Sequence, residues 1–429
     1  MGIAAATLVI ALLLLLGSGV WIGLALIGVA WLGMDLFTQR SVGDAMAITI
    51  WGGLSSWTLT ALPLFVWMGE ILFRTRLSED LFSGLAPWVE RLPGRLLHTN
   101  TIGSTIFAAV SGSSAATCIT VGKITLPELA KRGYPQAMSV STLAGASTLG
   151  LLIPPSIIMI VYGVSADVSI SKLFVAGVVP GLVLCLLFMA YTIGWALLHP
   201  DKVPAAEETL SFVQKLHASR RLIPVAALIA AVLGSIYLGI ATATEAAAVG
   251  VVASLTLSAL QGTLNFKTLT DGVVSAVRLY CMIALILAGS AFLTLTMGYV
   301  GLPRHLAESM ALLNLSQGQL VVLLAVFFVI LGCFLDGISM VVLTIGVLMP
   351  TILQAGIDPL WFGIFLILVV EMAQITPPVG FNLFVLQGMV KREISWLSRV
   401  SVPPFLVLIL GLVLIYFFPA LVTWLPANM

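Results

Sequence analysis

The chain has 429 residues, of which 60% are apolar and only 9% are charged, and its formal net charge is +1. Soluble domains carry about 25% charged residues, so a chain this long and this apolar needs lipid around it. A net charge near zero gives no reason to expect nucleic acid or an acidic macromolecule as a partner. The composition therefore predicts an all-α, polytopic integral membrane protein.

In the first half, apolar segments predict three helices, at 2–17, 19–38 and 48–72. An arginine-rich loop follows at 73–98. The next segment, 99–130, is interrupted by Ser111-Gly112-Ser113-Ser114, which suits a re-entrant hairpin that turns at this tetrapeptide. A helix over about 136–163 is broken at Pro154-Pro155, because prolines donate no backbone hydrogen bond. A span near 172–198 then leads to a polar mid-chain loop.

The second half predicts the same order of elements. Helices are expected near 222–240, 242–261 and 275–300. A second hairpin is expected over about 319–355, with its tip between Gly332 and Ser339. A second broken helix follows, interrupted at Thr376-Pro377-Pro378-Val379-Gly380, and a last span precedes the C-terminus.

The two halves align over their most distinctive residues, with one six-residue difference in an intervening loop. A shift of 223 positions superimposes the following pairs: Pro127 on Pro350, Gly133 on Gly356, Pro154-Pro155 on Pro377-Pro378, and Pro180 on Pro403. Upstream, a shift of 229 superimposes Met68-Gly69 on Met297-Gly298, Leu77 on Leu306 and Glu79 on Glu308. Such agreement predicts an internal duplication.

Basic residues indicate how the two copies are oriented. If the N-terminus is outside, the cytoplasmic loops hold all 19 basic residues except four: Arg40, Lys123, Lys172 and Arg304. The copies are then inverted repeats in a bacterial inner membrane, with both termini periplasmic. The expected divisions are scaffold helices at 1–98 and 222–318, transport elements at 99–199 and 319–429, and an inter-repeat cytoplasmic loop at 200–221.

The four backbone breaks are candidate binding sites, because unpaired backbone groups at membrane depth need a substitute partner. Carbonyl and hydroxyl oxygens suit a small hard cation such as Na⁺. Pairing each hairpin tip with the Pro-Pro break of its own repeat gives two candidate cation sites near the midplane. The alternative is that the prolines only kink helices and the small residues only allow close packing.

Ionisable residues inside apolar segments are further candidates, because burying them is costly. Asp336 is the foremost, since it lies at the second hairpin tip and aligns with Ser113. Glu371 precedes the second break and suits either a role there or a helix contact. Glu245 is expected to cap a helix start, and Lys123 either snorkels or attracts an anionic substrate.

Five segments together resemble the large membrane subunit of TRAP (tripartite ATP-independent periplasmic) transporters: SGSSAAT at 111–117, LPELAKRGYP at 126–135, GLLIPPS at 150–156, TEAAAVG at 244–250 and ITPPVGFN at 375–382. The resemblance extends over essentially the whole chain. It implies an elevator-type, Na⁺-coupled importer of organic acids. It also implies two partners, a small four-helix membrane subunit on a separate chain and a periplasmic substrate-binding protein.

The resemblance also implies which residues bind the ions. The first Na⁺ site would comprise Ser111, Ser113, Ser114, Gly150, Ile153 and Pro155. The second would comprise Gly332, Asp336, Gly337, Ala373 and Thr376. Many members have threonine or glycine where this chain has Ala373, which offers only its backbone carbonyl. The candidate substrate ligands lie at the same breaks: Ser113, Ser156, Thr376 and Asn382.

The sequence thus predicts Na⁺-coupled uptake of a small organic acid anion, of the C4-dicarboxylate or sialic acid class. No GxxxxGK[ST] motif is present, so ATP is not expected as the energy source. A stand-alone Na⁺–dicarboxylate symporter of related hairpin architecture is the alternative. An enzyme or a channel is not expected, because neither a compact His, Asp and Glu cluster nor a continuous polar helix stripe occurs. A purely structural subunit would not need the paired breaks.

Overall fold

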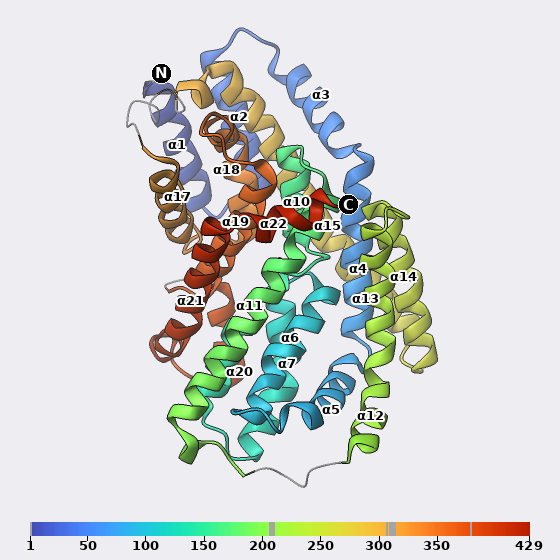
Figure 1. The fold of residues 1–429 in the computed structure, drawn as a ribbon. Coiled ribbons are helices and arrows are strands. Elements are labelled where there is room, and N and C mark those ends of the chain that lie inside the picture. The colour runs from blue at the N-terminus through green and yellow to red at the C-terminus, as the bar shows by residue number, and fades with distance from the viewer. Residues whose placement is uncertain (1, 206–210, 306–307, 309–314, 378–379) are drawn as a thin grey trace.

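The computed structural model describes the chain except residues 1, 206–210, 306–307, 309–314 and 378–379, and its described elements are all helices (Figure 1). The elements of the first half are α1 (Gly2–Gly17), α2 (Ile22–Phe37), α3 (Val42–Leu54), α4 (Ala61–Phe73), α5 (Leu77–Val89), α6 (His98–Ser111), α7 (Ser114–Lys131), α8 (Gln136–Ser147), α9 (Leu149–Leu152), α10 (Ile157–Ala166) and α11 (Ile170–Leu198). The hairpin α6–α7 and the interrupted helix α8–α10 occupy the segments where the sequence predicts them.

The second half contains the helices α12 (Phe212–Ser219), α13 (Ile223–Tyr237), α14 (Ala243–Leu260), α15 (Phe266–Val300), α17 (Gln317–Leu331), α18 (Gly337–Gln354), α19 (Pro359–Gln374), α20 (Phe381–Val390), α21 (Ile394–Phe417) and α22 (Ala420–Ala427). Here α17 and α18 are the two arms of the predicted second hairpin, and each packs on α19. The second break lies between α19 and α20. Of the second break, Pro378 and Val379 lie outside the described residues.

The polytopic character is clear from the lengths of these helices. Among the described residues, six helices are long and apolar enough to cross a membrane, or up to eight if each bent pair counts as one span. One bent pair is α8–α9 with α10, which turns by 41° at the first Pro-Pro break. The other is α3 with the segment Trp57–Phe73, which turns by 55°. The sequence suggests one continuous helix over 48–72, but the structure divides it at Ser55-Ser56.

Several helices of the second half begin at a capping box, in which two side chains satisfy the first free N–H groups reciprocally. The helices and their capping pairs are α12 with Ser211 and Gln214, α14 with Thr242 and Glu245, α15 with Asn265 and Thr268, and α17 with Ser316 and Gln319. The capping role expected for Glu245 is therefore confirmed. The box at Asn265 also explains why α15 begins at Phe266, before the start near 275 that hydropathy suggests.

Several helices of the second half begin 223 positions after a helix of the first half, which is the same shift that aligns the two halves of the sequence. The second arms of the two hairpins, α7 and α18, have 18 residues each. Ser114 and Gly337, where these arms begin, are 223 positions apart, as are Gln136 and Pro359, where α8 and α19 begin. Pro127 and Pro350 thus occupy the same position in α7 and α18, and Gly133 and Gly356 follow the ends of these two helices.

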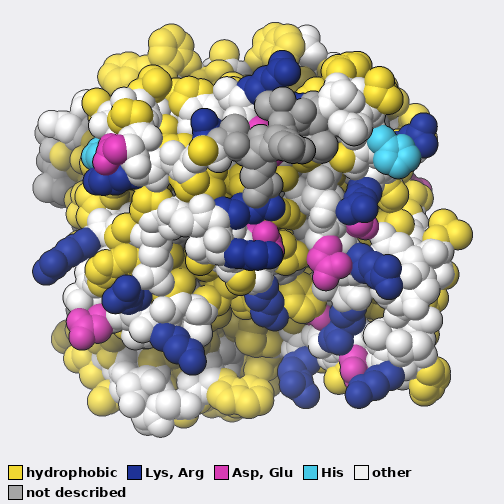
Figure 2. Space-filling model, turned by 90° about the horizontal axis from the view of Figure 1, so that it is seen from below, with side chains coloured by type: hydrophobic (Ala, Val, Ile, Leu, Met, Phe, Trp, Pro, Cys, Tyr) yellow, Lys and Arg dark blue, Asp and Glu magenta, His cyan; other side chains and the backbone are white. Residues whose placement is uncertain are grey.

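The helices form two neighbouring groups. In the first, α2 and α4 pack extensively on α15, and α14 packs on α4 and α13 (Figure 1). In the second, the hairpin α6–α7 packs on α8, and α11 packs on α21. The end of the molecule that carries α5 and α12 gathers many Lys and Arg side chains (Figure 2).

Candidate functional site

The first hairpin turns at Gly112 and Ser113, and both residues suit this place. Gly112 has a φ of +59°, a left-handed conformation that glycine adopts at little cost when it ends a helix. Ser113 is extended, and its Oγ accepts a hydrogen bond from the backbone N–H of Ala116 at 3.4 Å. Ser111 Oγ lies 2.8 Å from Thr117 Oγ1. The tip therefore gathers hydroxyl and carbonyl oxygens at the start of α7.

This tip packs directly on the first Pro-Pro break. A Cβ placed on Gly112 would lie 2.8 Å from the carbonyl oxygen of Pro155, and one placed on Gly150 would lie 2.7 Å from that of Ser113. Ile157 also donates its backbone N–H to the carbonyl of Gly112 at 3.4 Å. Glycine at both positions permits this approach. The expected pairing of tip and break is therefore present in the first repeat.

Ile153 contributes differently from its neighbours in the predicted first site. Its side chain packs on Gly181 of α11, where an added Cβ would lie 2.7 Å from Ile153 Cγ1. The side chain therefore faces an apolar helix surface. Only the backbone of Ile153 is suited to binding a cation, which agrees with the expectation that such breaks offer carbonyl oxygens.

The second hairpin turns between Gly332 and Asp336. Asp336 is the N-cap of α18, and its carboxylate accepts hydrogen bonds from the N–H groups of Ile338 at 3.1 Å and Ser339 at 3.2 Å. The Ser339 hydroxyl also donates to this carboxylate. Asp336 itself is exposed. Its carboxylate is therefore directed at the start of its own helix, where the helix dipole favours a negative charge.

The second tip packs on the second break as the first tip packs on the first. Gly332 lies against the side chain of Ala373, and a Cβ on Gly337 would lie 2.5 Å from Val370 Cγ1. Cys333 Sγ lies 3.3 Å from the carbonyl oxygen of Pro377. Thr376 Oγ1 donates to the carbonyl of Met372 at 2.6 Å. Its hydroxyl proton is thus already used within the helix end.

The donor set around both breaks fits a hard cation. Buried polar atoms without a hydrogen-bond partner in the described residues include Ser156 Oγ at the first break and Gln374 Oε1 at the second. Across the described ranges, no group of three His, Cys, Asp or Glu side chains could hold a metal ion. A cation would therefore bind mainly through carbonyl, hydroxyl and amide oxygens, which is the chemistry that Na⁺ accepts.

Comparison with known proteins identifies the family of this chain. The sequence model of the family described as "Tripartite ATP-independent periplasmic transporter, DctM component" matches residues 8–421. The chain belongs to the DctM family. The members of this family are transporter permeases and not enzymes. The chain is therefore the large permease subunit of a TRAP transporter.

Two relatives show how DctM-family proteins vary. The C4-dicarboxylate TRAP transporter large permease protein of Rhodobacter capsulatus is 31% identical over 407 residues, which cover 91% of this chain and 92% of that protein. The isethionate TRAP transporter permease protein DctMQ of Oleidesulfovibrio alaskensis is 31% identical over 415 residues, which cover 96% of this chain and 64% of that longer protein. Substrates therefore differ between relatives of similar identity.

A solved structure has the same overall fold at low sequence identity. The Alcanivorax borkumensis YdaH transporter, described as having an unusual topology, superposes with a TM-score of 0.62 and 16% identity. The match covers 96% of this chain and 99% of that chain. At this identity the likeness concerns the fold alone.

The four candidate substrate ligands of this DctM-family chain differ in their surroundings. Ser156 and Asn382 are fully buried, and neither the Ser156 hydroxyl nor the Asn382 amide has a hydrogen-bond partner among the described residues. Ser113 and Thr376 use their hydroxyls in local helix-end bonds. Ser156 and Asn382 therefore retain the greater capacity to bind a polar substrate.

One contact at the first site does not follow from the sequence repeat. Glu371 of α19 accepts hydrogen bonds from the hydroxyl of Ser114 and from the N–H of Leu151, the latter at 3.0 Å. A residue of the second half of the chain thus reaches the hairpin tip and the break of the first half. In the sequence, Glu371 is marked only as an acidic residue inside an apolar segment. That position indicates a functional role but does not say which residues the side chain contacts.

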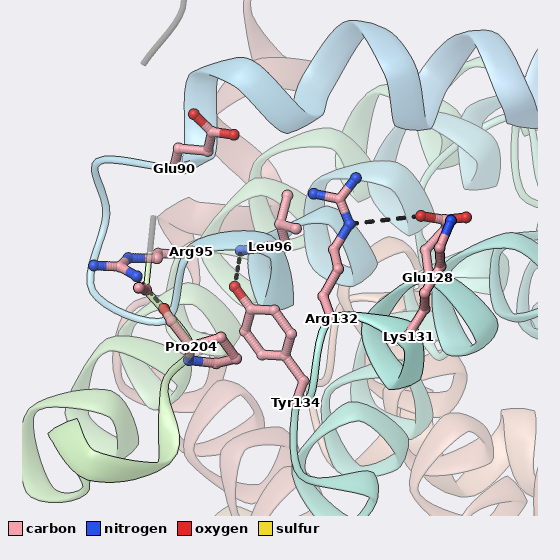
Figure 3. A pocket seen from close by; sticks show the side chains of 9 residues that line it. Glu90, Arg95, Leu96, Glu128, Lys131, Arg132, Tyr134 and Pro204 are labelled. Atoms are coloured by element: carbon pink, nitrogen blue, oxygen red, sulfur yellow. Dashed lines mark hydrogen bonds and ion pairs between the residues drawn. The ribbon is translucent and has the colours of Figure 1, made fainter. Parts of the chain in front are cut away.

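A separate polar cavity of about 290 Å³ lies at the basic end of the molecule (Figure 3). Its polar walls are largely bonded to one another. Arg132 lies 3.5 Å from Glu128, Arg95 donates to the carbonyl of Pro204, and Tyr134 accepts the N–H of Leu96 at 3.3 Å. These contacts tie the ends of the first hairpin to the mid-chain loop. We interpret this cavity as part of the anchorage of that hairpin.

Proposed function

We propose that this chain is the permease subunit of a Na⁺-coupled importer of a small organic acid anion. The observation that carries the proposal is the contact of each hairpin tip with the helix break of its own repeat. Gly112 meets Pro155 in the first repeat, and Cys333 meets Pro377 in the second. Paired breaks of this kind give cation and substrate sites near the membrane midplane in secondary transporters.

The energy available from such coupling is sufficient for accumulation. One Na⁺ moving inward across 100 mV gains about 2.3 kcal/mol before its concentration gradient is counted. Two cations, one for each proposed site, roughly double this gain. Import of a monoanion costs about 2.3 kcal/mol across the same potential, so two cations leave a net gain without ATP. The substrate is proposed to be a small carboxylate of the C4-dicarboxylate or sialic acid class.

The proposed mechanism is an elevator movement of two inverted repeats. The segments 99–199 and 319–429 would move as one transport block against the scaffold segments 1–98 and 222–318. Glycines occur at two of the contacts between them, where they allow the helices to approach closely. A Cβ on Gly69 of α4 would lie 3.4 Å from the carbonyl of Val110 in the first hairpin, and Gly346 of α18 lies directly against Thr294 of α15.

The chain is proposed to function with a small membrane subunit and a periplasmic binding protein. The family description, which names a tripartite periplasmic transporter, supports both partners. The DctMQ relative shows that a separate small-subunit chain is not the only arrangement. The basic end in Figure 2 is proposed to face the cytoplasm of a bacterial inner-membrane protein, and both termini are proposed to be periplasmic.

Uptake by reconstituted protein tests this function. Liposomes containing the chain and its small subunit would be given the matching binding protein, a panel of labelled organic acids and an inward Na⁺ gradient. Uptake should require both the binding protein and Na⁺, with choline as the control cation. Uptake without the binding protein would favour the stand-alone symporter. Uptake that ignores the Na⁺ gradient would contradict Na⁺ coupling.

A further inference from the structure

Gly69 and Gly298 hold the same place in the two halves of the chain, but their surroundings differ. The shift of 229 positions that aligns the scaffold segments superimposes one on the other. A Cβ on Gly69 would lie 3.4 Å from the carbonyl oxygen of Val110 and 3.5 Å from that of Ser111, at the tip of the first hairpin. A Cβ on Gly298 would meet nothing within 4 Å, and Gly298 is exposed. The contact that glycine permits in the first half is therefore not made in the second.

The counterpart of the first tip is also uncovered in the second half. The shift of 223 positions superimposes Val110 and Ser111 on Cys333 and Phe334, in the turn of the second hairpin. The Phe334 side chain is 71% exposed, whereas Ser111 is half-buried. Both sides of the contact seen in the first half, the glycine and the tip, are thus left open in the second half.

The second hairpin instead meets α15 through its second arm, α18. The Ser290 hydroxyl donates to the carbonyl of Val342, and a Cβ on Gly346 would lie 3.0 Å from Thr294 Cβ. The two residues of α15 are one helical turn apart, and so are the two residues of α18. The two helices therefore lie parallel in a defined register.

This register places the second tip well short of Gly298. When the register is continued backward, the first residue of α18, Gly337, falls at about the level of Leu285. Gly298 is about 13 residues further along α15, or about 20 Å at the rise of an α-helix. Ser290, Thr294 and Gly298 follow one another at intervals of four, so they share one face of α15. Their small side chains allow α18 to approach closely along this whole face.

We propose that Gly298 receives the tip of the second hairpin in a second state of the protein. In that state the transport block has moved about 20 Å along α15. Phe334 and its neighbour at the tip then contact Gly298, just as the first tip contacts Gly69 now. The hydrogen bond from Ser290 to α18 belongs to the state described here and is released in the second state. The inference rests on the elevator movement proposed above.

The two glycines are occupied in turn. The two repeats are proposed to be inverted, so their hairpins enter the membrane from opposite sides. A rigid movement that brings the second tip to Gly298 therefore takes the first tip away from Gly69. Gly298 is open in this structure because its contact belongs to the other state.

Disulfide trapping tests whether the second tip reaches Gly298. The test pair is Gly298→Cys with Phe334→Cys, in the full chain with its small subunit in lipid nanodiscs. A disulfide needs Cα atoms about 4.4–6.8 Å apart, so this pair cannot link without a large movement. The control pair is Thr294→Cys with Gly346→Cys, which are already adjacent.

Both pairs are introduced into a chain without its native cysteines, which are replaced as follows: Cys118→Ala, Cys185→Ala, Cys281→Ala and Cys333→Ser. Each pair should link on oxidation, and each link should stop uptake until a reductant is added. If the control pair links and the reduced protein takes up substrate, but the test pair never links, the inference is overturned.

Substitutions of increasing size at Gly298 test the same contact in a chain with all its native cysteines. A Cβ at the 3.4 Å found for Gly69 is in ordinary contact, so Gly298→Ala should keep wild-type uptake. Gly298→Leu should lower uptake at least about tenfold, because leucine blocks the second state. Its Tm should not change, since space is free around Gly298 in the present state. The matched control is Gly194→Leu in α11, which also has nothing within 4 Å and should keep both uptake and Tm.

The outcomes distinguish this inference from the proposed function. Full uptake by Gly298→Leu would overturn the inference. So would loss of the small subunit from the purified Gly298→Leu complex, because the glycine would then serve that partner. If wild-type uptake ignores the Na⁺ gradient while the test pair links and Gly298→Leu is inactive, Na⁺ coupling fails and the inference stands.

Discussion

Ser113 and Asp336 are 223 positions apart, and each is the N-cap of the second arm of its hairpin. Ser113 Oγ accepts the N–H of Ala116, and the Asp336 carboxylate accepts those of Ile338 and Ser339. The two residues share a structural task but differ in charge. Replacement by alanine would therefore remove a helix cap as well as any cation ligand.

Asp336→Asn separates these two roles. Asparagine caps helices about as well as aspartate, whereas alanine costs about 0.5–2 kcal/mol. We expect Asp336→Asn to keep the wild-type Tm and to lose most Na⁺-stimulated uptake, because the charge at the second site is gone. Asp336→Ala should lose both. Uptake and thermal unfolding of the same preparations check this, and full Na⁺-stimulated uptake in Asp336→Asn would remove Asp336 from the cation site.

Gly150→Ala should disturb the first site through its backbone. The added methyl would lie 2.7 Å from the carbonyl oxygen of Ser113 and equally close to the backbone of Ser114, so the tip must move. We expect the Na⁺ concentration for half-maximal uptake to rise at least about tenfold, the equivalent of about 1.4 kcal/mol. Gly194→Ala in α11 is the control, because nothing lies within 4 Å of its added Cβ. Equal Na⁺ dependence in both variants would contradict the site.

The hairpins and breaks could be predicted because their signals are local. Gly112, Ser113 and Asp336 are residues that end or begin helices wherever they occur, and Pro154-Pro155 interrupts a helix without help from neighbours. The division of the helix at Ser55-Ser56 has a weaker local signal, because only the glycine pair Gly52-Gly53 precedes it and no proline lies at the break. Both α3 and α4 pack on α15 there.

The contact between Glu371 and Ser114 could not be predicted from local signals either. It joins residues 257 positions apart, and neither residue is matched by an acid or a partner in the other repeat. Thr148 occupies the position equivalent to Glu371 and bonds the carbonyl of Gly145 instead. A symmetric alignment therefore pairs the two candidate sites but gives no indication of this contact between the halves of the chain.

The orientation of the chain can be checked with reporters at two places. Alkaline phosphatase is active only in the periplasm. Green fluorescent protein fluoresces in the cytoplasm and does not fold when it is exported through the general secretory route. A fusion after Met429 should give phosphatase activity and no fluorescence, and a fusion in the loop at Lys202 should give the reverse. The opposite pattern would show that the basic end faces outward, against the positive-inside rule.

Gly289→Leu should destabilise the scaffold helices. A Cβ on Gly289 would lie 2.5 Å from the carbonyl oxygen of Gly23, so α15 and α2 approach each other at a pair of glycines. Overpacking of this kind costs about 1–3 kcal/mol. We expect a lower Tm and less assembled protein in detergent. Gly298→Leu should match the wild type, because no neighbouring atom lies within 4 Å of a Cβ added there. Equal stability of both variants would contradict the close packing of α15 on α2.

Asn382→Leu should separate substrate binding from stability. The Asn382 amide is 0% exposed and has no hydrogen-bond partner in the described ranges, and a buried polar group in that condition costs about 1–3 kcal/mol. Leucine removes this cost, so the Tm should stay equal or rise, whereas uptake of the organic acid should fall by at least about tenfold if the amide binds the substrate.

Asn100→Leu is the matched control for that experiment. Asn100 is equally buried, but it donates to the carbonyl of Ser139 at 3.0 Å and to Thr142 Oγ1 at 2.9 Å. Its replacement removes both of these buried hydrogen bonds without replacing them, so the Tm should fall. A lower Tm in Asn382→Leu, with uptake reduced only in proportion to the folded protein, would show that Asn382 is a packing residue and not a substrate ligand.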